Sequence, residues 1–466
     1  MSTVAKEDSV LVIGGGTWGC SIALELARNG YSNVTVLDGE DVPSSIAAGS
    51  DLNKIMEEGH QSGDDTDVAY AWNRLHDLCT TAWLNDPVYK PHYHRTGYVM
   101  AASSDAAYEA LLGDIRGREA EYSKVESAGQ FRNTMPKGVL TGDFVAWRGF
   151  AKPSGAGWVF ARGAIISAKQ EAERLGVRFV TGQRGLVTKL LFSNATEQGR
   201  APKSGALGGV RSADGTIYHA HTVILANGAS ADDLIDLKQQ LRPTAWTLAH
   251  IKMTPEEAGL YKDLPVLFNI EKGFFMEPSA ETHELKICDE HPGYINPIYK
   301  APSSDTNLVQ GEKSKGERII IGSRPFAKQQ IPIESEERVR AFLGETMPHL
   351  AARPFSFARI CWDADTVDRM PLVDWYASDD DAAEGGGRLL LAIGGSGHCF
   401  KTMPAMGQVV LEFLEGRADD KTRRAFRWRP KTAVNRNWWD VQGRWGAQGE
   451  VMDFNNVRGW TAIGEA

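Results

Sequence analysis

A glycine-rich turn that begins at residue 14 constrains the fold of this chain more than any other feature. Gly14-Gly15-Gly16-Thr17-Trp18-Gly19 fits Gly-x-Gly-x-x-Gly, follows the apolar run 10–13 and opens an expected helix over 17–29. A second apolar run at 34–37 completes a strand–helix–strand unit. In that setting Gly14 permits the tight turn, Gly16 lets the backbone approach a pyrophosphate, and Gly19 lets the helix pack on the strand. The turn therefore predicts a dinucleotide site, with phosphate at the positive end of the helix.

The residues that end the apolar strands indicate which dinucleotide to expect. Asp38 ends the second strand about 20 residues after the glycine turn, where an acid binds the ribose of either FAD or NAD. Two later apolar strands, 222–226 and 389–393, end in Asn227-Gly228 and Gly394-Gly395. An extended FAD is clasped by several such returning segments, which a single-domain nicotinamide enzyme does not need. FAD is therefore the expected cofactor.

Length and hydrophobic pattern predict an α/β chain of two domains. The 466 residues exceed one ordinary domain. Continuous apolar strands indicate a parallel sheet covered on both faces, whereas the alternating, aromatic-rich runs of 241–350 favour an antiparallel sheet inserted into the first domain. The predicted FAD-binding domain comprises residues 1–90, 150–235 and 355–466. The predicted substrate domain comprises residues 91–149 and 236–354.

Charge and hydropathy exclude several classes of function. A net charge of −9 would repel the phosphates of nucleic acid, and no run of about 18 apolar residues is present to cross a bilayer. The first ten residues lack an apolar signal core, and 461–466 is not a peroxisomal signal of the Ser-Lys-Leu type, so we expect a cytoplasmic protein. Five scattered cysteines predict free thiols, and no residue set has the spacing of a metal site.

Further stretches match one enzyme family in the same order along nearly the whole chain. They lie at residues 14–38, 44–54, 154–158, 240–247, 285–294, 361–366 and 435–454. On these motifs the chain resembles the fructosyl amino acid oxidases, or amadoriases, fungal members of the monomeric sarcosine oxidase family. The resemblance implies a glutathione-reductase-like Rossmann domain for FAD. It also implies an inserted α+β substrate domain, built on a mixed or antiparallel sheet, that covers the flavin.

The resemblance assigns two residues to the flavin itself. Cys361 matches the cysteine that bonds the flavin 8α-methyl group, with Cys399 as a rival nucleophile. Lys286 matches the lysine near flavin N5 that accelerates oxygen reduction, where a fixed positive charge stabilises a superoxide-like state. Without the resemblance, the alternation of Lys286 with apolar Leu285 and Ile287 favours the solvated face of a strand.

Substrate recognition is implied by the same likeness. Lys54 is expected over the flavin face or against the sugar, and Glu290 against the sugar hydroxyls or the substrate nitrogen. Lys401 is expected to pair with the substrate carboxylate, because a carboxylate removed from water needs a cation. His398 departs from the arginine of several amadoriases, which can hold a carboxylate with two parallel hydrogen bonds. Cys399 also stands where glycine is usual.

The wider set expected to line FAD runs from the glycine turn to the C-terminal glycine loop. Its members are Gly14, Gly16, Thr17, Trp18, Gly19, Asp38, Ser45, Ala48, Gly49, Lys54, Val187, Asn227, Gly228, Cys361, Asp363, Gly395, Gly397, Cys399, Phe400 and Lys401.

These residues imply an FAD-dependent oxidase that cleaves the C–N bond of fructosyl amino acids. Hydride transfer to flavin would give an imine that water hydrolyses, and oxygen would be reduced to hydrogen peroxide. His398 and Cys399 keep an alternative open: oxidation of N-methyl amino acids or a related secondary amine in fungal secondary metabolism. A dehydrogenase that does not use oxygen would be favoured if Lys286 lay far from the flavin. The partners are then a small amine and oxygen, and we expect a monomer.

Overall fold

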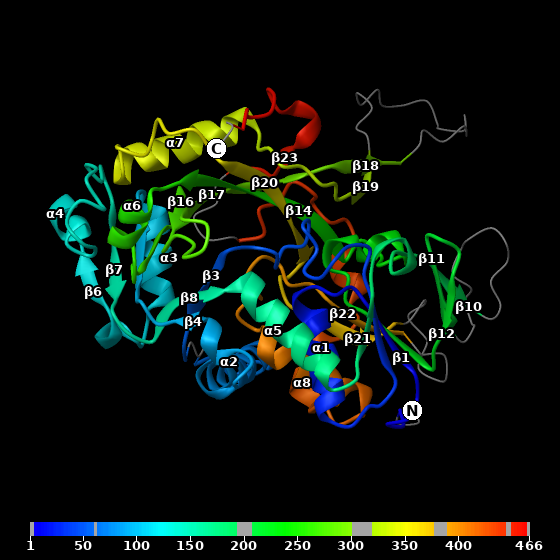
Figure 1. Cartoon of the computed structure of the whole chain (residues 1–466). Helices are drawn as coiled ribbons and strands as arrows, with labels where there is room; N and C mark the ends of the chain where they lie inside the picture. The colour runs from blue at the N-terminus through cyan, green and yellow to red at the C-terminus, as the bar shows by residue number, and fades with distance from the viewer. Residues whose placement is uncertain are drawn as a thin grey trace.

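The computed structural model of the chain describes residues 4–59, 63–192, 207–300, 319–376, 389–443 and 449–463. A six-stranded sheet with strand order β21-β22-β13-β1-β2-β9 forms the lower part of the molecule in Figure 1. Its centre is β1 (Val10–Ile13), which pairs in parallel with β2 (Val34–Leu37) and β13 (Thr222–Leu225). The outer strands are β9 (Arg178–Val180), β22 (Leu389–Ile393) and the antiparallel β21 (Leu372–Trp375).

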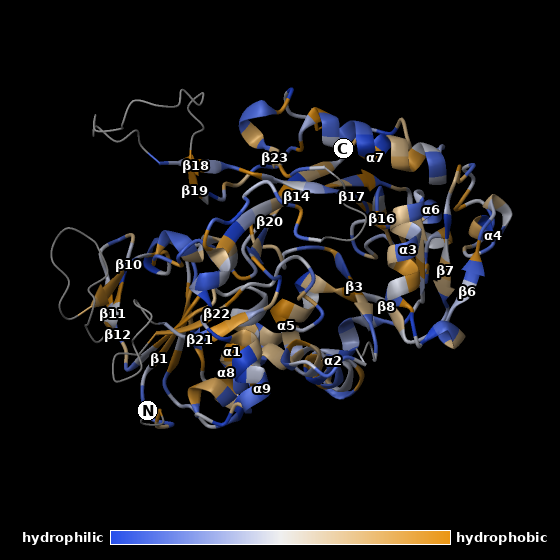
Figure 2. Cartoon of the chain, turned by 180° about the vertical axis from the view of Figure 1, so that it is seen from behind, coloured by the Kyte–Doolittle hydropathy of each residue, from blue (hydrophilic) through white to orange (hydrophobic). Residues whose placement is uncertain are grey.

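Both faces of this sheet are covered, because its short central strands are apolar on both sides. Val10 and Val12 pack in a cluster with α1 (Thr17–Arg28), α5 (Ala161–Arg174) and α8 (Met403–Leu414). Leu11 and Ile13 face the opposite cluster, which includes residues of a separate three-stranded sheet. That sheet comprises β10 (Val187–Phe192), β11 (Leu207–Ser212) and β12 (Ile217–His219). Figure 2 shows the apolar character of the central strands and of the helices against them.

A nine-stranded sheet forms the upper part of the molecule. Its longest strands are β14 (Leu241–Lys252), β17 (Glu284–Ile295) and β20 (Phe357–Thr366), which pair antiparallel. The remaining strands are β5 (Tyr98–Ala102), β6 (Ser123–Val125), β7 (Arg148–Lys152), β15 (Val266–Asn269), β16 (Gly273–Phe275) and β23 (Met452–Asp453). Helix α7 (Ile333–Thr346) covers its outer face (Figure 1). The predicted fold class, a Rossmann-type sheet joined to a second domain on a mixed sheet, is confirmed.

Smaller elements connect the two large sheets. Strand β3 (Asn53–Glu57) pairs with β8 (Ala156–Phe160), which also pairs with β4 (Tyr93–His94). The remaining helices and strands are α2 (Asp67–Asn85), α3 (Asp105–Asp114), α4 (Ala128–Arg132), α6 (Pro255–Leu260), α9 (Asp420–Phe426), β18 (Pro297–Tyr299) and β19 (Ile320–Ser323). Strand β20 pairs with β14 across the predicted boundary at residue 355, and the domain limits stay a prediction.

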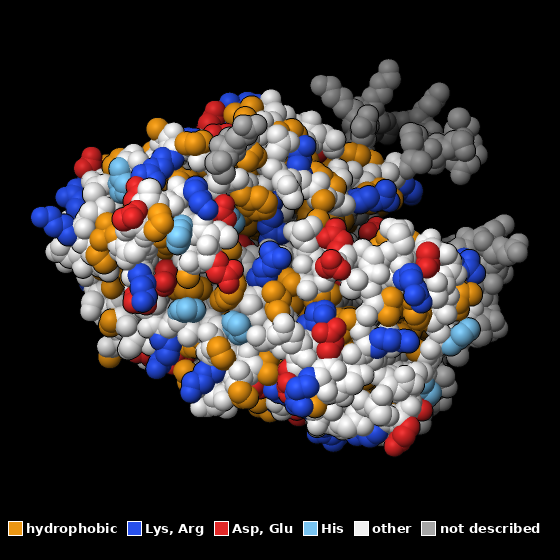
Figure 3. Space-filling view, in the orientation of Figure 1, with side chains coloured by type: hydrophobic (Ala, Val, Ile, Leu, Met, Phe, Trp, Pro, Cys, Tyr) orange, Lys and Arg blue, Asp and Glu red, His pale blue; other side chains and the backbone are white. Residues whose placement is uncertain are grey.

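The surface carries charges of both signs. Figure 3 shows Lys and Arg interspersed with Asp and Glu over the face that it presents, without a broad field of one sign. Among the described residues, no helix combines the length and the apolar character needed to cross a membrane.

Candidate active site

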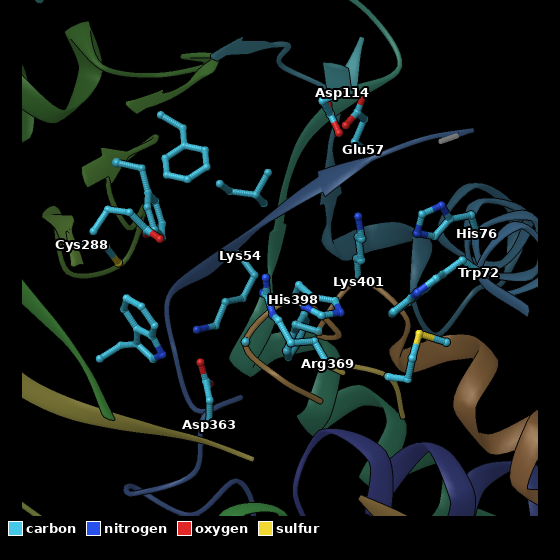
Figure 4. A pocket seen from close by; sticks show the side chains of 18 of the residues that line it. Lys54, Glu57, Trp72, His76, Asp114, Cys288, Asp363, Arg369, His398 and Lys401 are labelled. Atoms are coloured by element: carbon cyan, nitrogen blue, oxygen red, sulfur yellow. Dashed lines mark hydrogen bonds between the residues drawn. The ribbon is translucent and has the colours of Figure 1, made fainter. Parts of the chain in front are cut away.

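A cavity of about 620 Å³ lies between the two large sheets. Its wall combines residues of β3, β17, β20, α2 and the loop that precedes α8 (Figure 4). The predicted residues that line it are Lys54, Glu290, Cys361, Asp363, Gly397, His398, Phe400 and Lys401. Residues more than 300 positions apart in sequence therefore meet at one wall. In Figure 4 the Lys54 side chain extends towards Asp363, whereas that of Lys401 extends towards Glu57 and Asp114.

The glycine turn has the geometry of a phosphate cradle. Gly14 has φ +98°, and a Cβ there would lie 2.7 Å from the carbonyl oxygen of Ala226. A Cβ on Gly19 would lie 1.8 Å from the carbonyl oxygen of Gly14, so the helix can approach the strand only with glycine there. A Cβ on Gly16 would meet no protein atom within 4 Å, which leaves open space beside the first turn of α1. Thr17 begins that helix, whose free N–H groups favour an anion.

The expected adenosine end is assembled around the end of β2. Asp38 Oδ2 accepts a hydrogen bond from the Gly15 N–H at 2.7 Å, and burial raises the pKa of Asp38 despite this bond and that from Glu40. The segment that leads into β10 passes directly beside it, because a Cβ on Gly185 would lie 2.2 Å from the Asp38 carbonyl oxygen. Val187 accordingly packs in the same cluster as Leu37. The segment that carries Val187 therefore runs beside the end of β2, where Asp38 lies.

Loops from distant parts of the chain close over the same turn. A Cβ on Gly49 would lie 2.3 Å from Thr17 Oγ1 and 3.4 Å from the Phe400 ring. Gly395 lies beside Trp18, whose ring is 3.9 Å from where its Cβ would be. The predicted residues at 17–18, 48–49 and 395–400 therefore form one neighbourhood. Ser45 lies at its edge, where its backbone N–H and hydroxyl donate to Glu40.

Two buried polar atoms at this neighbourhood fit a bound dinucleotide. Asn227 Oδ1, at the end of β13, and Arg359 Nη2, on β20, are buried without a hydrogen-bond partner. Asn227 directly precedes Gly228, which has φ +59°, and its Cα faces the Gly14 turn. A buried polar group without a partner is costly, so these atoms indicate a polar occupant. Together with the open side of Gly16, they fit FAD.

Two lysines, Lys54 on β3 and Lys286 on β17, contact the carboxylate of Asp51. Asp51 Oδ2 lies 2.9 Å from Lys54 Nζ and 2.9 Å from Lys286 Nζ. Lys286 Nζ also donates to the Asn53 carbonyl oxygen at 2.6 Å. The side chain of Lys286 is 0% exposed, so the expectation of a solvated strand face is wrong. Sequence reasoning assigned no role to Asp51, although it stands three residues before Lys54 in a stretch quoted for the family resemblance.

Strand alternation explains the burial of Lys286. Leu285 and Ile287 pack in the cluster beneath α7, so Lys286, Cys288 and Glu290 face the opposite side of β17. That side is turned to the other domain and not to solvent. Cys288 and Glu290 line the cavity, whereas Lys286 lies behind the wall and reaches it through Asp51.

The contact between Asp51 and Lys54 shifts the pKa of both groups. Burial alone would raise the pKa of Asp51, but Lys286, Lys54 and Arg359 hold it far below its ordinary value. Burial would lower the pKa of Lys54, yet Asp51 raises it above its ordinary value. Asp51 and Lys54 are therefore both charged at neutral pH.

Both candidate flavin nucleophiles are buried thiols. Cys361 is 5% exposed, and its Sγ lies 3.8 Å from the Ala48 carbonyl oxygen. Burial raises its pKa, although Lys54 and Arg359 act in the opposite direction. Burial raises the pKa of Cys399 to about 12. Cys361 lines the cavity whereas Cys399 does not, which favours Cys361 for contact with a cavity occupant.

His398 is held by an arginine that sequence reasoning did not select. Arg369 Nη2 donates to His398 Nδ1 at 3.0 Å, and both side chains line the cavity. Because a guanidinium only donates, Nδ1 must accept and the ring proton of neutral His398 lies on Nε2. Trp72 packs against the same ring, with centroids 5.2 Å apart. The guanidinium of Arg369 thus lies beside His398 in the fold. In sequence, Arg369 comes three residues after the family motif at 361–366, and no sequence pattern indicated it.

The glycine cradle, the two sheets and the cavity between them define a dinucleotide-dependent redox enzyme. No group of three or more His, Cys, Asp or Glu within the described ranges is placed to hold a metal.

Comparison with known proteins gives the family. A family model described as FAD dependent oxidoreductase matches residues 9–413. The chain is 47% identical to Amadoriase I, a fructosyl amine:oxygen oxidoreductase of Aspergillus fumigatus, over 100% of both chains with a TM-score of 0.87. It is 45% identical to Amadoriase II, a fructosamine oxidase of the same fungus, over 99% and 98% of the two chains with a TM-score of 0.88. The L-saccharopine oxidase of Schizosaccharomyces pombe is 26% identical over 439 residues, 92% of this chain and 95% of that protein. The chain belongs to the FAD-dependent oxidoreductase family and, within it, to the amadoriase group of amine-oxidising enzymes.

Proposed function

We propose that this protein is an oxidase of fructosyl amino acids. The observation that carries the proposal is the cavity beside the glycine cradle, which gathers Cys361, Glu290, Lys401 and the Lys54–Asp51–Lys286 group in one place. The proteins known as Amadoriase I and II, which share this fold over nearly their whole length, act on fructosyl amines.

In the proposed reaction, a fructosyl amino acid, oxygen and water give a free amino acid, glucosone and hydrogen peroxide. When bound, FAD would supply the acceptor for the hydride lost from the carbon beside the substrate nitrogen and the route for two electrons to oxygen. The carbon–nitrogen double bond of the oxidised substrate is then hydrolysed by water. The chain's own residues mainly orient the substrate and supply fixed charge, which is how much of enzyme catalysis operates.

Two hydrogen-bond donors in the cavity suit the substrate carboxylate. Lys401 supplies an ammonium, and His398 supplies an Nε2–H whose tautomer is fixed by Arg369. Together they offer what a single arginine offers in several amadoriases. Glu290 is proposed to accept hydrogen bonds from the sugar hydroxyls or the substrate nitrogen, and Lys54 to stand over the flavin or against the sugar.

Lys286 is proposed to act as a fixed positive charge where oxygen is reduced. Its side chain is 0% exposed, so water screens its charge little. Its direct contact with Asp51, which lines the cavity, argues against a remote lysine and hence against a dehydrogenase that does not use oxygen.

Cys361 is proposed to carry FAD covalently. The test is acid precipitation of the purified wild type and of Cys361→Ala. We expect the yellow colour to stay with the wild-type polypeptide and to pass into the supernatant of the variant. Cys399→Ala is the matched control and should keep its colour bound, since Cys399 does not line the cavity. Free flavin released from the wild type would contradict the covalent bond.

A second candidate is oxidation of another secondary amine, such as an N-methyl amino acid. Two observations support this second candidate: the similarity to L-saccharopine oxidase and the histidine at position 398. A peroxide-release panel separates the two candidates: fructosyl-valine, Nε-fructosyl-lysine, sarcosine, an N-methylated aromatic amino acid and saccharopine. We expect peroxide from a fructosyl compound. Absence of peroxide with both fructosyl substrates would rule out the first candidate. We also propose that the protein is a monomer, which light scattering would test, and that it is located in the cytoplasm.

A further inference from the structure

We propose that Asp51 is a positioning residue whose carboxylate holds Lys54 and Lys286 side by side as two ammonium groups at the cavity. What the charge of Lys286 does there rests on the proposed function. The inference about Asp51 itself rests on geometry.

Both carboxylate oxygens of Asp51 are engaged. One oxygen, Oδ2, contacts both lysine nitrogens, and Oδ1 accepts from the Leu52 N–H at 2.9 Å. The backbone is fixed as well, because the Asp51 N–H donates to Gly49 at 2.9 Å and its carbonyl accepts from Arg162 at 3.0 Å. A side chain held at this many points has little freedom. It therefore sets where both ammonium groups lie.

The arrangement places like charges unusually close. Since both nitrogens lie 2.9 Å from the same oxygen, they are separated by at most twice that distance. Two buried ammonium groups at such a separation repel strongly unless an anion lies between them. Asp51 is that anion.

Two further charged side chains, both on β20, lie near the pair. Arg359 acts on Asp51, and both Arg359 and Asp363 act on the adjacent Cys361. Arg359 adds a further positive charge. Cys288 and Cys361 also face the lysines, but their pKa values are raised by burial, so they stay neutral thiols. Asp363 also lines the cavity, but Asp51 contacts both nitrogens through one oxygen, so loss of the Asp51 charge should favour loss of a proton from one of the lysines.

Asp51→Asn tests the proposal because it keeps the shape and removes the charge. The enzyme is reduced anaerobically by light without substrate, then mixed with oxygen, and the rate of flavin reoxidation is followed from about pH 6 to pH 10. We expect the variant to reoxidise at least about tenfold more slowly at the alkaline end and to regain rate as pH falls and the lysine is reprotonated. Asp51→Glu, which keeps the charge, should retain the wild-type pH profile.

A double variant separates charge from mere structure. In Asp51→Asn/Lys54→Met the repelling partner of Lys286 is also removed, so the pH profile of reoxidation should move back towards that of Lys54→Met alone. A purely structural role for Asp51 gives no such rescue. If Asp51→Asn does not accumulate as folded protein, the double variant should accumulate.

Thermal unfolding against pH gives a readout that does not depend on activity. In Asp51→Asn a lysine with a lowered pKa in the folded state regains its ordinary value, about 10.4, on unfolding. The unfolded chain then binds more protons, so the stability of this variant should rise with pH relative to wild type up to about pH 10. The additional rise should disappear in the double variant.

The outcomes distinguish this inference from the proposed function. Wild-type pH profiles of both reoxidation and unfolding in Asp51→Asn would overturn the role of Asp51, as would failure of the double variant to fold when Lys54→Met folds. Normal reoxidation in Lys286→Met would instead overturn the proposed role of Lys286, while the unfolding measurement would still decide for or against Asp51.

Discussion

At the glycine turn, six consecutive residues build the cradle, whereas at the cavity Asp51, Lys286 and Cys361 come from segments far apart in the chain. The cradle depends on backbone shape: Gly14 turns, Gly19 admits the helix and Gly16 leaves a space. The cavity depends on side-chain charge brought together by the pairing of β14 with β17 and β20. Changes at the first region should therefore affect folding and cofactor content, and changes at the second should affect rates.

The largest effect is expected at the glycine turn, and a matched pair of substitutions defines it. Gly19→Ala would place a Cβ 1.8 Å from the Gly14 carbonyl oxygen, so we expect destabilisation of about 3 kcal/mol or more and little folded protein. Gly16→Ala meets no protein atom, so the chain should fold with reduced flavin content. Thermal unfolding and the ratio of flavin to protein absorbance measure the two effects. A fully flavin-loaded Gly16→Ala enzyme would contradict the cradle.

The next effect is expected at Lys286. Lys286→Met should leave reduction of the flavin by substrate largely intact but slow its reoxidation by oxygen by roughly 100-fold, the size seen when one electrostatic group is removed from an active site. Stopped-flow measurement of the two half-reactions separates these steps. Lys124→Met, an exposed lysine on β6, is the matched control and should not change either rate. Equal slowing of both half-reactions would argue for general disruption of the site.

A smaller effect is expected at Arg369. Arg369→Gln removes the donor that fixes the tautomer of His398, so the KM for a substrate with a free carboxylate should rise roughly tenfold while kcat changes less. The same substrate with its carboxylate amidated should show a smaller change in KM. Arg424→Gln breaks an exposed ion pair with Asp67 and serves as the control. An equal rise in KM for both substrates would contradict the proposal that His398, held by Arg369, binds the substrate carboxylate.

Much of the fold could be predicted from the sequence because its signals are local. The βαβ unit at 10–37 was predicted within a residue of β1, α1 and β2, since apolar strands and a glycine turn are written in consecutive residues. The strand over 222–226 was predicted one residue longer than β13 (Thr222–Leu225). Sheet membership was harder to foresee, because the pairing of β20 with β14 depends on residues more than 100 positions apart.

The sequence by itself determined the dinucleotide turn, the second sheet and, through the family resemblance, the residues at the cavity. Only the tertiary structure decided what Lys286 is. Alternation along β17 predicts that Lys286 faces away from Leu285 and Ile287. It does not predict whether solvent or another domain lies on that side. Burial against Asp51 answered that question, and the contact of Arg369 with His398 is likewise a matter of space. Backbone conformation is set by neighbours in sequence, whereas the charge environment of a side chain is set by neighbours in space.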